Sequence, residues 1–306
     1  MLIKKGQDRN DWMTYRRDLE GHKKRRKVFA KRRQFDIDYF GIVLKIARFF
    51  LKLTGILKIM PNNYHKIIVR ENELFSSKIK EPIRILHLSD LHLDENPDIV
   101  PLVMEKLKSV QADICIITGD FGTYRKNQQD TIERFNQLLP SIKEPLPVIC
   151  ILGNHDGHDL VAGLENGRLT FLTNQFVDLK IHNNNVRIIG CDDVHYFYRP
   201  ENVEIFKNFE SKDLNIALVH SPEIFDKVQE SGADFYFCGH SHGGQIRLPP
   251  LRLITRCKRG RQFYIGRWVY QNMHGFTHSG IGASIIKWRL NTHPELVIHH
   301  IKPVSS

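Results

Sequence analysis

The chain has 306 residues, of which 41% are hydrophobic and 26% are charged, a composition typical of a soluble globular protein. Its five cysteines include no C-x-x-C pair, which argues against a disulfide framework or a zinc knuckle and favours reduced thiols in a reducing compartment. The net charge of +11 is unevenly placed, because residues 1–35 carry thirteen Lys and Arg against four Asp and Glu. The rest of the chain is therefore close to neutral.

Residues 1–36 are predicted to form a basic arm. Two cationic runs, 23–27 and 31–33, give it a strong positive charge, and charge blocks of this kind are typical of flexible arms attracted to an anionic surface. Nucleic acid is not the expected partner, because Trp12 and Tyr15 are the arm's only large aromatic residues apart from two phenylalanines outside the cationic runs. The anionic surface expected here is a membrane.

Residues 37–62 are predicted to form an amphipathic helix that lies on the membrane surface. Lys45, Arg48 and Lys52 fall on one narrow stripe at helical spacing, and apolar side chains cover the other faces. No uninterrupted apolar stretch approaches the roughly 20 residues that a spanning helix needs. The pattern is typical of a helix in the plane of the interface, which predicts a peripheral membrane protein.

Two other interpretations of this N-terminal region remain open. The basic amphipathic helix can instead pack onto the domain that follows it. The sequence Arg32-Arg33-Gln34-Phe35 also resembles a twin-arginine export signal, although the following apolar segment carries charges and lacks a small-residue cleavage site.

Residues 63–306 alternate between strand-like and helix-like segments, which predicts one α/β domain. Helices are expected at 98–110 and 128–139, and several antiparallel strands with a turn at Gly275 are expected within 263–301. Five short apolar runs are predicted strands, and each is followed by a polar block. These runs are 83–88, 114–118, 148–152, 216–219 and 235–238.

The five polar blocks contain the side chains of a candidate metal site. They read Ser89-Asp90-Leu91-His92, Gly119-Asp120, Gly153-Asn154-His155-Asp156, Val219-His220-Ser221 and Gly239-His240-Ser241-His242. Strand ends are where side chains from distant parts of a chain can converge. The candidate metal ligands are Asp90, His92, Asp120, Asn154, His220, His240 and His242.

This set of side chains suits hydrolysis of a phosphate ester or diphosphate assisted by two metal ions. Two ions roughly 3.5–4 Å apart can acidify a water and neutralise charge on the phosphoryl oxygens. Mixed imidazole, carboxylate and amide ligands favour manganese, with iron or zinc as alternatives, over calcium, which prefers oxygen alone. His155 lies next to a candidate ligand, and we expect it to protonate the leaving oxygen or to stabilise developing charge.

The ordered blocks resemble the calcineurin-like metallophosphoesterase family, whose pattern is D-x-H, G-D, G-N-H-D/E, a lone His and G-H-x-H. The resemblance implies a four-layer αββα sandwich of two mixed β-sheets flanked by helices. It also implies that Asp120 bridges the two ions. Asp90, His92 and His242 would complete the first site, and Asn154, His220 and His240 the second. His155 matches the family's catalytic histidine, which is not a ligand.

The stretch from His242 to Pro249 resembles the membrane-associated bacterial branch of the family. One member type of that branch cleaves UDP-2,3-diacylglucosamine to 2,3-diacylglucosamine 1-phosphate and UMP in lipid A biosynthesis, and the resemblance implies the same reaction here. Arg247 and Arg252 are the expected contacts to phosphate or uridine of this UDP-linked lipid, and no obligate protein partner is inferred. A broader membrane-associated phosphodiesterase is the alternative. A non-enzymatic scaffold is less favoured, because Asn154-His155 is intact.

Overall fold

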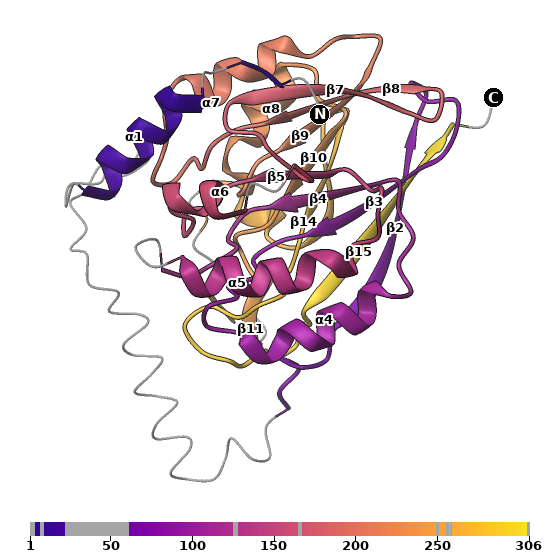
Figure 1. Ribbon diagram of the computed structural model, residues 1–306. Helices are drawn as coiled ribbons and strands as arrows, with labels where there is room; N and C mark the ends of the chain where they lie inside the picture. Colours follow the sequence, from indigo (N-terminus) through magenta and orange to yellow (C-terminus); the bar gives the residue numbers. More distant parts are fainter. Residues whose placement is uncertain are drawn as a thin grey trace, which may run out of the picture.

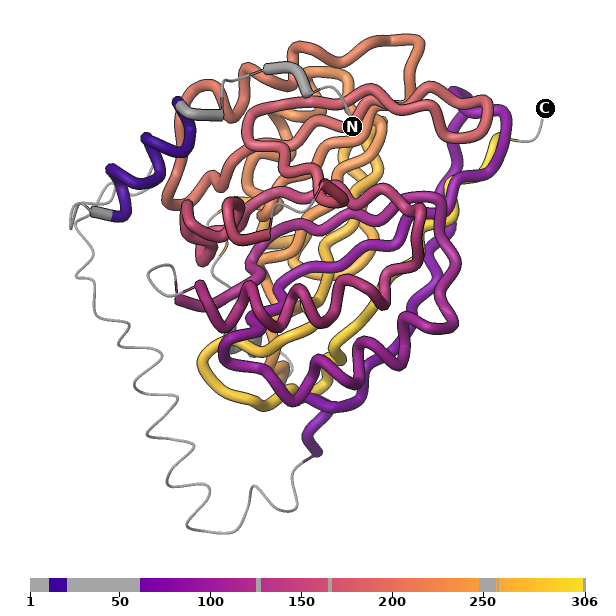
Figure 2. Tube along the Cα trace, in the orientation of Figure 1, coloured from indigo at the N-terminus to yellow at the C-terminus, as the bar shows by residue number. Residues whose placement is uncertain are grey.

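Two β-sheets pack face to face between layers of helices (Figures 1 and 2). This architecture confirms the expected α/β sandwich of two mixed sheets flanked by helices. The computed structural model describes residues 4–6, 9–21, 61–124, 128–164, 167–248, 251–254, 257 and 259–304.

The six-stranded sheet carries three of the five polar blocks. Its central strands β3, β4 and β5 run parallel to one another, whereas β15 runs antiparallel to β3 and parallel to β2. The strand β15 is thus an interior strand of this sheet. The order across the sheet is β2 (Ile68–Ser76), β15 (Glu295–Pro303), β3 (Ile83–Leu88), β4 (Ile114–Thr118), β5 (Val148–Ile151) and β6 (Leu169–Phe171).

The seven-stranded sheet carries the other two polar blocks, which follow the parallel strands β9 and β10. A separate two-stranded hairpin, β11 (Gly244–Leu248) and β12 (Leu251–Ile254), comes directly after the last block. The order across the large sheet is β1 (Lys4–Gly6), β7 (Gln175–Ile181), β8 (Asn184–Gly190), β9 (Leu214–Leu218), β10 (Phe235–Cys238), β14 (Met273–Thr277) and β13 (Gly266–Tyr270).

The apolar runs read as continuous because both faces of the central strands are buried. In β3, Ile83 and Ile85 point into the core between the two sheets, and Leu86 and Leu88 point to the helices outside. The helices over the six-stranded sheet are α4 (Val100–Leu107), α5 (Gln129–Leu138) and α6 (His158–Leu164), and those associated with the seven-stranded sheet are α7 (Glu201–Glu204) and α8 (Phe225–Glu230). Short 3-10 helices occur at Pro97–Ile99, Leu139–Ser141, Ile205–Asn208, Pro222–Ile224 and Arg261–Phe263.

The described part of the N-terminal region belongs to the domain. The strand β1 pairs antiparallel with β7, and helix α1 (Arg9–Gly21) packs Trp12 into the core that α6 also joins. For these residues the expectation of a flexible arm is wrong, because buried apolar and ionic contacts hold them in place. The proposed amphipathic helix lies outside the described residues except for its last two positions.

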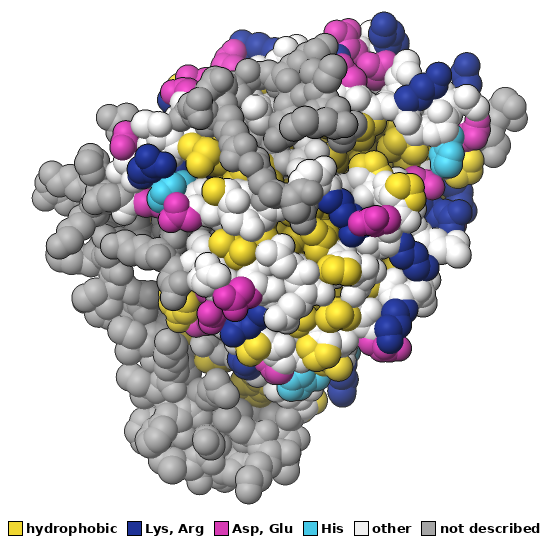
Figure 3. Space-filling model, in the orientation of Figure 1, with side chains coloured by type: hydrophobic (Ala, Val, Ile, Leu, Met, Phe, Trp, Pro, Cys, Tyr) yellow, Lys and Arg dark blue, Asp and Glu magenta, His cyan; other side chains and the backbone are white. Residues whose placement is uncertain are grey.

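The described surface is mixed in charge. On the face shown in Figure 3, lysines and arginines are interspersed with acidic residues rather than gathered into one patch, as expected for a nearly neutral domain.

All five cysteines are buried free thiols, so no disulfide contributes to the fold. Within the described ranges, no helix has both the length and the apolarity required to cross a bilayer.

Candidate metal centre

The five polar blocks meet where strands of the two sheets end. They bring two groups of ligand-type side chains together, and within each group the ligand atoms lie within 4.8 Å of one another. One group comprises Asp90, His92 and His242, and the other comprises Asp120, His220 and His240. Every residue that the sequence analysis assigned to the metal site is therefore close to this point, including Asn154 as described below.

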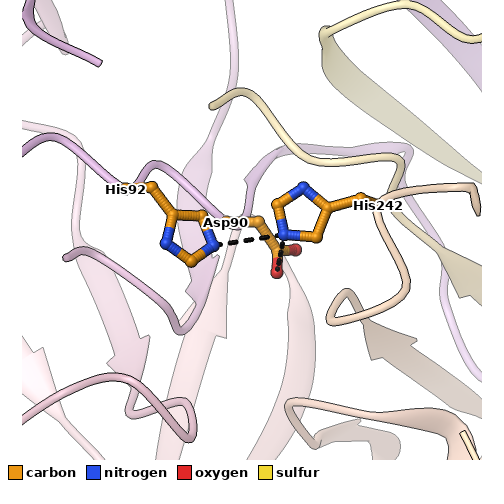
Figure 4. A group of neighbouring side chains, drawn as sticks. All are labelled: Asp90, His92 and His242. Carbon is orange, nitrogen blue, oxygen red and sulfur yellow. Dashed lines mark hydrogen bonds and ion pairs between the residues drawn. The ribbon is translucent and has the colours of Figure 1, made fainter. Parts of the chain in front are cut away.

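The first group has two imidazoles facing each other beside a carboxylate (Figure 4). The Nε2 atoms of His92 and His242 are 3.1 Å apart, and His242 Nε2 is 3.5 Å from Asp90 Oδ1. All three residues are buried. Facing nitrogens at this distance need a proton or a cation between them, so the arrangement fits a bound metal ion.

The second group gathers around the side-chain oxygen of Asn154. Asn154 Oδ1 lies 3.1 Å from His220 Nε2 and 2.9 Å from His240 Nδ1. Asp120 Oδ2 is 3.2 Å from His220 Nε2 and 3.7 Å from His92 Nε2, so it lies between the two groups. This is the position that a bridging carboxylate requires.

Backbone carbonyls fix the direction of two imidazole rings. His220 Nδ1 lies 2.7 Å from the carbonyl oxygen of Thr118, and because a carbonyl only accepts, this nitrogen donates and leaves Nε2 facing Asn154. His155 Nδ1 donates in the same way to the carbonyl of Thr123 at 2.9 Å. Such outer contacts hold metal-binding imidazoles in one tautomer and orientation.

The backbone at the site is held in an unusual conformation. Five of the seven candidate ligands have a positive φ between 45° and 69°, a region that non-glycine residues rarely adopt. These are Asp90, His92, Asp120, His240 and His242. The flanking glycines permit close packing, since a Cβ on Gly153 would lie 2.2 Å from Asp120 Oδ1 and one on Gly239 would lie 2.2 Å from Asp90 Oδ2. Positive φ values concentrated at one point are typical of functional sites.

Burial and charge set the protonation of the cluster. Burial raises the pKa of the Asp90 carboxyl to about 6 and lowers the pKa of the His92 imidazole to about 4. Burial also lowers the pKa values of His240 and His242 well below the usual range. Burial opposes protonation of His220 too, but the Asp120 carboxylate outweighs it and raises the pKa of His220 to about 10. The site thus combines buried carboxylates with three imidazoles that resist protonation, those of His92, His240 and His242, and with His220, whose proton Asp120 stabilises. Carboxylate and imidazole ligands of this kind suit divalent cations.

Asp156 has a structural role that the sequence pattern did not indicate. Its carboxylate accepts the backbone N–H groups of Asp120, Phe121 and Gly153 at 2.8, 2.8 and 2.7 Å. It therefore ties the turn after β4 to the turn after β5.

The two arginines proposed for substrate lie on the hairpin beside the site. Arg247 and Arg252 are direct partners in the register of β11 and β12. The Arg247 side chain is partly buried, and the Arg252 side chain lies outside the described residues. Their role in substrate binding stays a prediction.

Two further residues at the site were missed from the sequence. The His195 ring stacks on His240 at 4.2 Å between centroids, and Arg289 is fully buried. Arg289 donates to the carbonyl of Ser279 at 2.8 Å and to that of Gly280 at 3.2 Å, in the loop that packs against Asp90 and His242. An isolated histidine or arginine gave no local signal, because only the folded chain brings them to this place.

A comparison with protein families agrees with the site. Residues 83–244 match the family described as calcineurin-like phosphoesterase. The chain belongs to this family. Calcineurin-like phosphoesterases use a dinuclear divalent metal site, and the two side-chain groups are candidates for it.

The relatives include characterised and uncharacterised bacterial proteins. The uncharacterized metallophosphoesterase YkoQ of Bacillus subtilis is 30% identical over 72% of this chain and 84% of that protein. The phosphodiesterase YaeI of Escherichia coli is 24% identical over 76% of this chain and 86% of that protein. The UDP-2,3-diacylglucosamine pyrophosphatase LpxG of Chlamydia trachomatis is 27% identical, over 55% of this chain and 65% of that protein.

Proposed function

We propose that this phosphoesterase hydrolyses the diphosphate of UDP-2,3-diacylglucosamine and releases 2,3-diacylglucosamine 1-phosphate and UMP. The single observation that carries the hydrolytic chemistry is the position of Asp120 between two groups of buried imidazoles and oxygen ligands. The similarity to LpxG supports the choice of substrate, because LpxG is a UDP-2,3-diacylglucosamine pyrophosphatase.

In this proposal the seven side chains hold two divalent ions, for which manganese is our first choice and iron or zinc the alternatives. Asp90, His92 and His242 would hold one ion, Asn154, His220 and His240 would hold the other, and Asp120 would contact both. When bound, the ions supply an acidified water and neutralise charge on the phosphoryl oxygens.

His155 is proposed to assist the departing phosphate group. Its Nδ1 proton is committed to the Thr123 carbonyl, and its backbone N–H donates to Asp120 Oδ1 at 2.9 Å. The other ring nitrogen, Nε2, is therefore left to contact substrate. The His155 ring lies edge-on to the His92 ring, with 5.3 Å between the two centroids. A proton at Nε2 can stabilise or protonate the leaving oxygen.

A membrane location is proposed from the chemistry of the substrate. Two acyl chains keep such a lipid in the bilayer, and a catalytic domain held at the cytoplasmic surface of the inner membrane gains effective concentration. The predicted helix at 37–62 and the cationic runs before it supply apolar and electrostatic contacts to an anionic leaflet. Arg247 and Arg252 would then contact the diphosphate or the uridine.

The test is mass spectrometry of the products formed from UDP-2,3-diacylglucosamine in oxygen-18 water with manganese. Lipid 1-phosphate and UMP are expected, and the labelled product reports which phosphorus was attacked. A parallel reaction with a generic aryl phosphodiester tests the second candidate, a broader membrane-associated phosphodiesterase, which the similarity to YaeI favours. Equal kcat/KM values on both substrates would contradict the lipid A role, and the assignment as a phosphoester hydrolase would still stand.

A further inference from the structure

We propose that helix α1 positions the loop that carries Asn154 and His155, so that the second metal site depends on the N-terminal helix. This inference rests on the metal assignment of the proposed function. It concerns residues that precede the segment matched to the family, which begins at residue 83.

Arg16 is the central contact between α1 and the site. Its side chain is 0% exposed and donates through Nε to both carboxylate oxygens of Asp192, at 3.0 and 3.1 Å. The guanidinium group also lies over the Phe197 ring, 3.8 Å from its centroid. A buried arginine with this many partners holds its neighbours in a single geometry.

The second guanidinium arm reaches the metal loop itself. Arg16 Nη1 donates to the carbonyl oxygen of Asp156 at 2.7 Å. Asp156 directly follows His155, and its carboxylate holds the backbone of Asp120 and Gly153. Through Asp156, helix α1 is therefore linked to the backbone of Asp120 and to that of Gly153, the residue before Asn154.

Glu20, one turn further along α1, fixes the other end of the same loop. Its carboxylate accepts the backbone N–H of His158 at 2.9 Å and contacts His158 Nδ1 at 2.6 Å. The loop between β5 and α6 is thus held at Asp156 and at His158 by two side chains of one helix. His158 accordingly pairs with Glu20.

The side chains of the first metal group are held by other segments, and this group meets the turn after β4 through its backbone, where the N–H of His92 donates to the Asp120 carbonyl at 3.1 Å. Asp90 accepts from Ser89 Oγ at 2.7 Å and from the backbone N–H of His240 at 3.0 Å, and His92 Nδ1 contacts Thr123 Oγ1. A disturbance of α1 should therefore reach the ion beside Asn154 before it reaches the ion beside Asp90. This asymmetry separates a positioning role from general support of the fold.

The experiment is a titration of the full chain with manganese. The concentration of free Mn²⁺ at each step is measured from its electron paramagnetic resonance signal. The variant Arg16→Met is compared with Arg17→Met, which changes the same charge at an exposed position of the same helix. Two binding steps are expected in the wild type and in Arg17→Met. In Arg16→Met one step should weaken by about 10- to 100-fold, the usual cost of removing a group that orients a metal ligand.

Turnover supplies the second readout. In Arg16→Met, kcat per folded molecule should fall by about 10- to 100-fold with KM little changed, because the reacting groups are misplaced while the substrate contacts remain. Arg16→Lys can keep one of the two contacts and should recover part of the loss.

Two variants keep the test decisive if Arg16→Met does not fold. The double variant Arg16→Met with Asp192→Asn leaves no buried carboxylate without its partner, and Glu20→Gln weakens only the contact to His158. Both should weaken the same single step. The inference is overturned if both steps stay unchanged or weaken equally. A wild type that binds fewer than two ions would instead contradict the metal assignment.

Discussion

Among the described residues, two clusters of buried histidines differ in the groups that accompany the imidazoles. In the core cluster, His87 contacts His299 at 3.1 Å and Thr118 Oγ1 at 2.9 Å, and His299 contacts Asn72 at 2.7 Å. His278 lies beside them, 4.8 Å from His87 between ring centroids. The candidate metal centre places its histidines against Asp90 and Asp120 instead.

The comparison shows that clustered histidines alone do not make a metal site. In the core cluster the imidazoles bond to one another and to neutral groups, and burial lowers the pKa values of His87 and His299 far below the usual range and that of His278 to about 3. In the metal centre the carboxylates offset cationic charge and the nitrogens converge on common points. The carboxylates therefore distinguish the functional cluster from the structural one.

Replacing Asp120 by asparagine removes a carboxylate, the group that the candidate metal centre has and the core histidine cluster lacks. We expect loss of both ions and a fall in kcat of about 10⁴-fold, since bound metal supplies several kcal/mol of transition-state stabilisation. Metal analysis and hydrolysis of an aryl phosphodiester measure the two effects. Asp159→Asn, an exposed acid near the same loop, is the matched control. Near-normal turnover in Asp120→Asn would show that the carboxylate does not bridge.

Replacing His155 by alanine tests a histidine of the site that is assigned a catalytic part and is not assigned as a ligand. Metal content should stay intact while kcat falls by about 10²- to 10⁴-fold, the usual contribution of general acid–base catalysis. The exposed His65→Ala serves as control. Turnover that survives in His155→Ala would remove its catalytic assignment, and loss of metal would make it a ligand.

Chelation should lower the stability of the folded protein through the metal centre and should not affect the core histidine cluster. An ion at about 100 times its Kd stabilises the folded state by about 2.7 kcal/mol, so removal of metal should lower the Tm of the wild type. The same treatment should leave the Tm of Asp120→Asn unchanged. Calorimetry with and without chelator makes the measurement, and equal shifts in both proteins would contradict the assignment.

The core cluster should make the fold sensitive to acid. Because burial lowers the pKa of His278 to about 3, this imidazole takes up its proton only on unfolding. Its contribution is complete above the unfolded pKa of about 6.5 and declines as the pH falls toward 3, by about 2 kcal/mol at pH 5. Urea unfolding from pH 7 to pH 5 should therefore show a shallower pH dependence in His278→Asn than in the wild type. His182→Asn, an exposed histidine, should keep the wild-type slope.

The sequence predicted best what local chemistry determines. The strands at 83–88, 114–118 and 235–238 match β3, β4 and β10, because buried parallel strands have unbroken apolar runs bounded by glycine or polar residues. The seven candidate ligands converge as expected, since they follow strands whose ends meet.

Long-range packing decided the features that the sequence did not predict. Gly275 was expected in a turn and lies within β14, where a Cβ would lie 2.2 Å from the Trp268 ring. The helix α1 has a charged sequence, and its place in the domain depends on Asp192 and Asp156, which are far away along the chain. The local sequence pattern indicates neither the close approach of Gly275 to Trp268 nor the contacts of α1 with Asp192 and Asp156.

The interior position of β15 has a consequence for biosynthesis. It lies between β2 and β3, which leave the ribosome long before it does. Until β15 arrives, the ladder groups of Ile83–Leu88 have no partner on that side, and unpaired strand edges invite association between nascent chains. Completion of this sheet therefore waits for translation to pass Pro303.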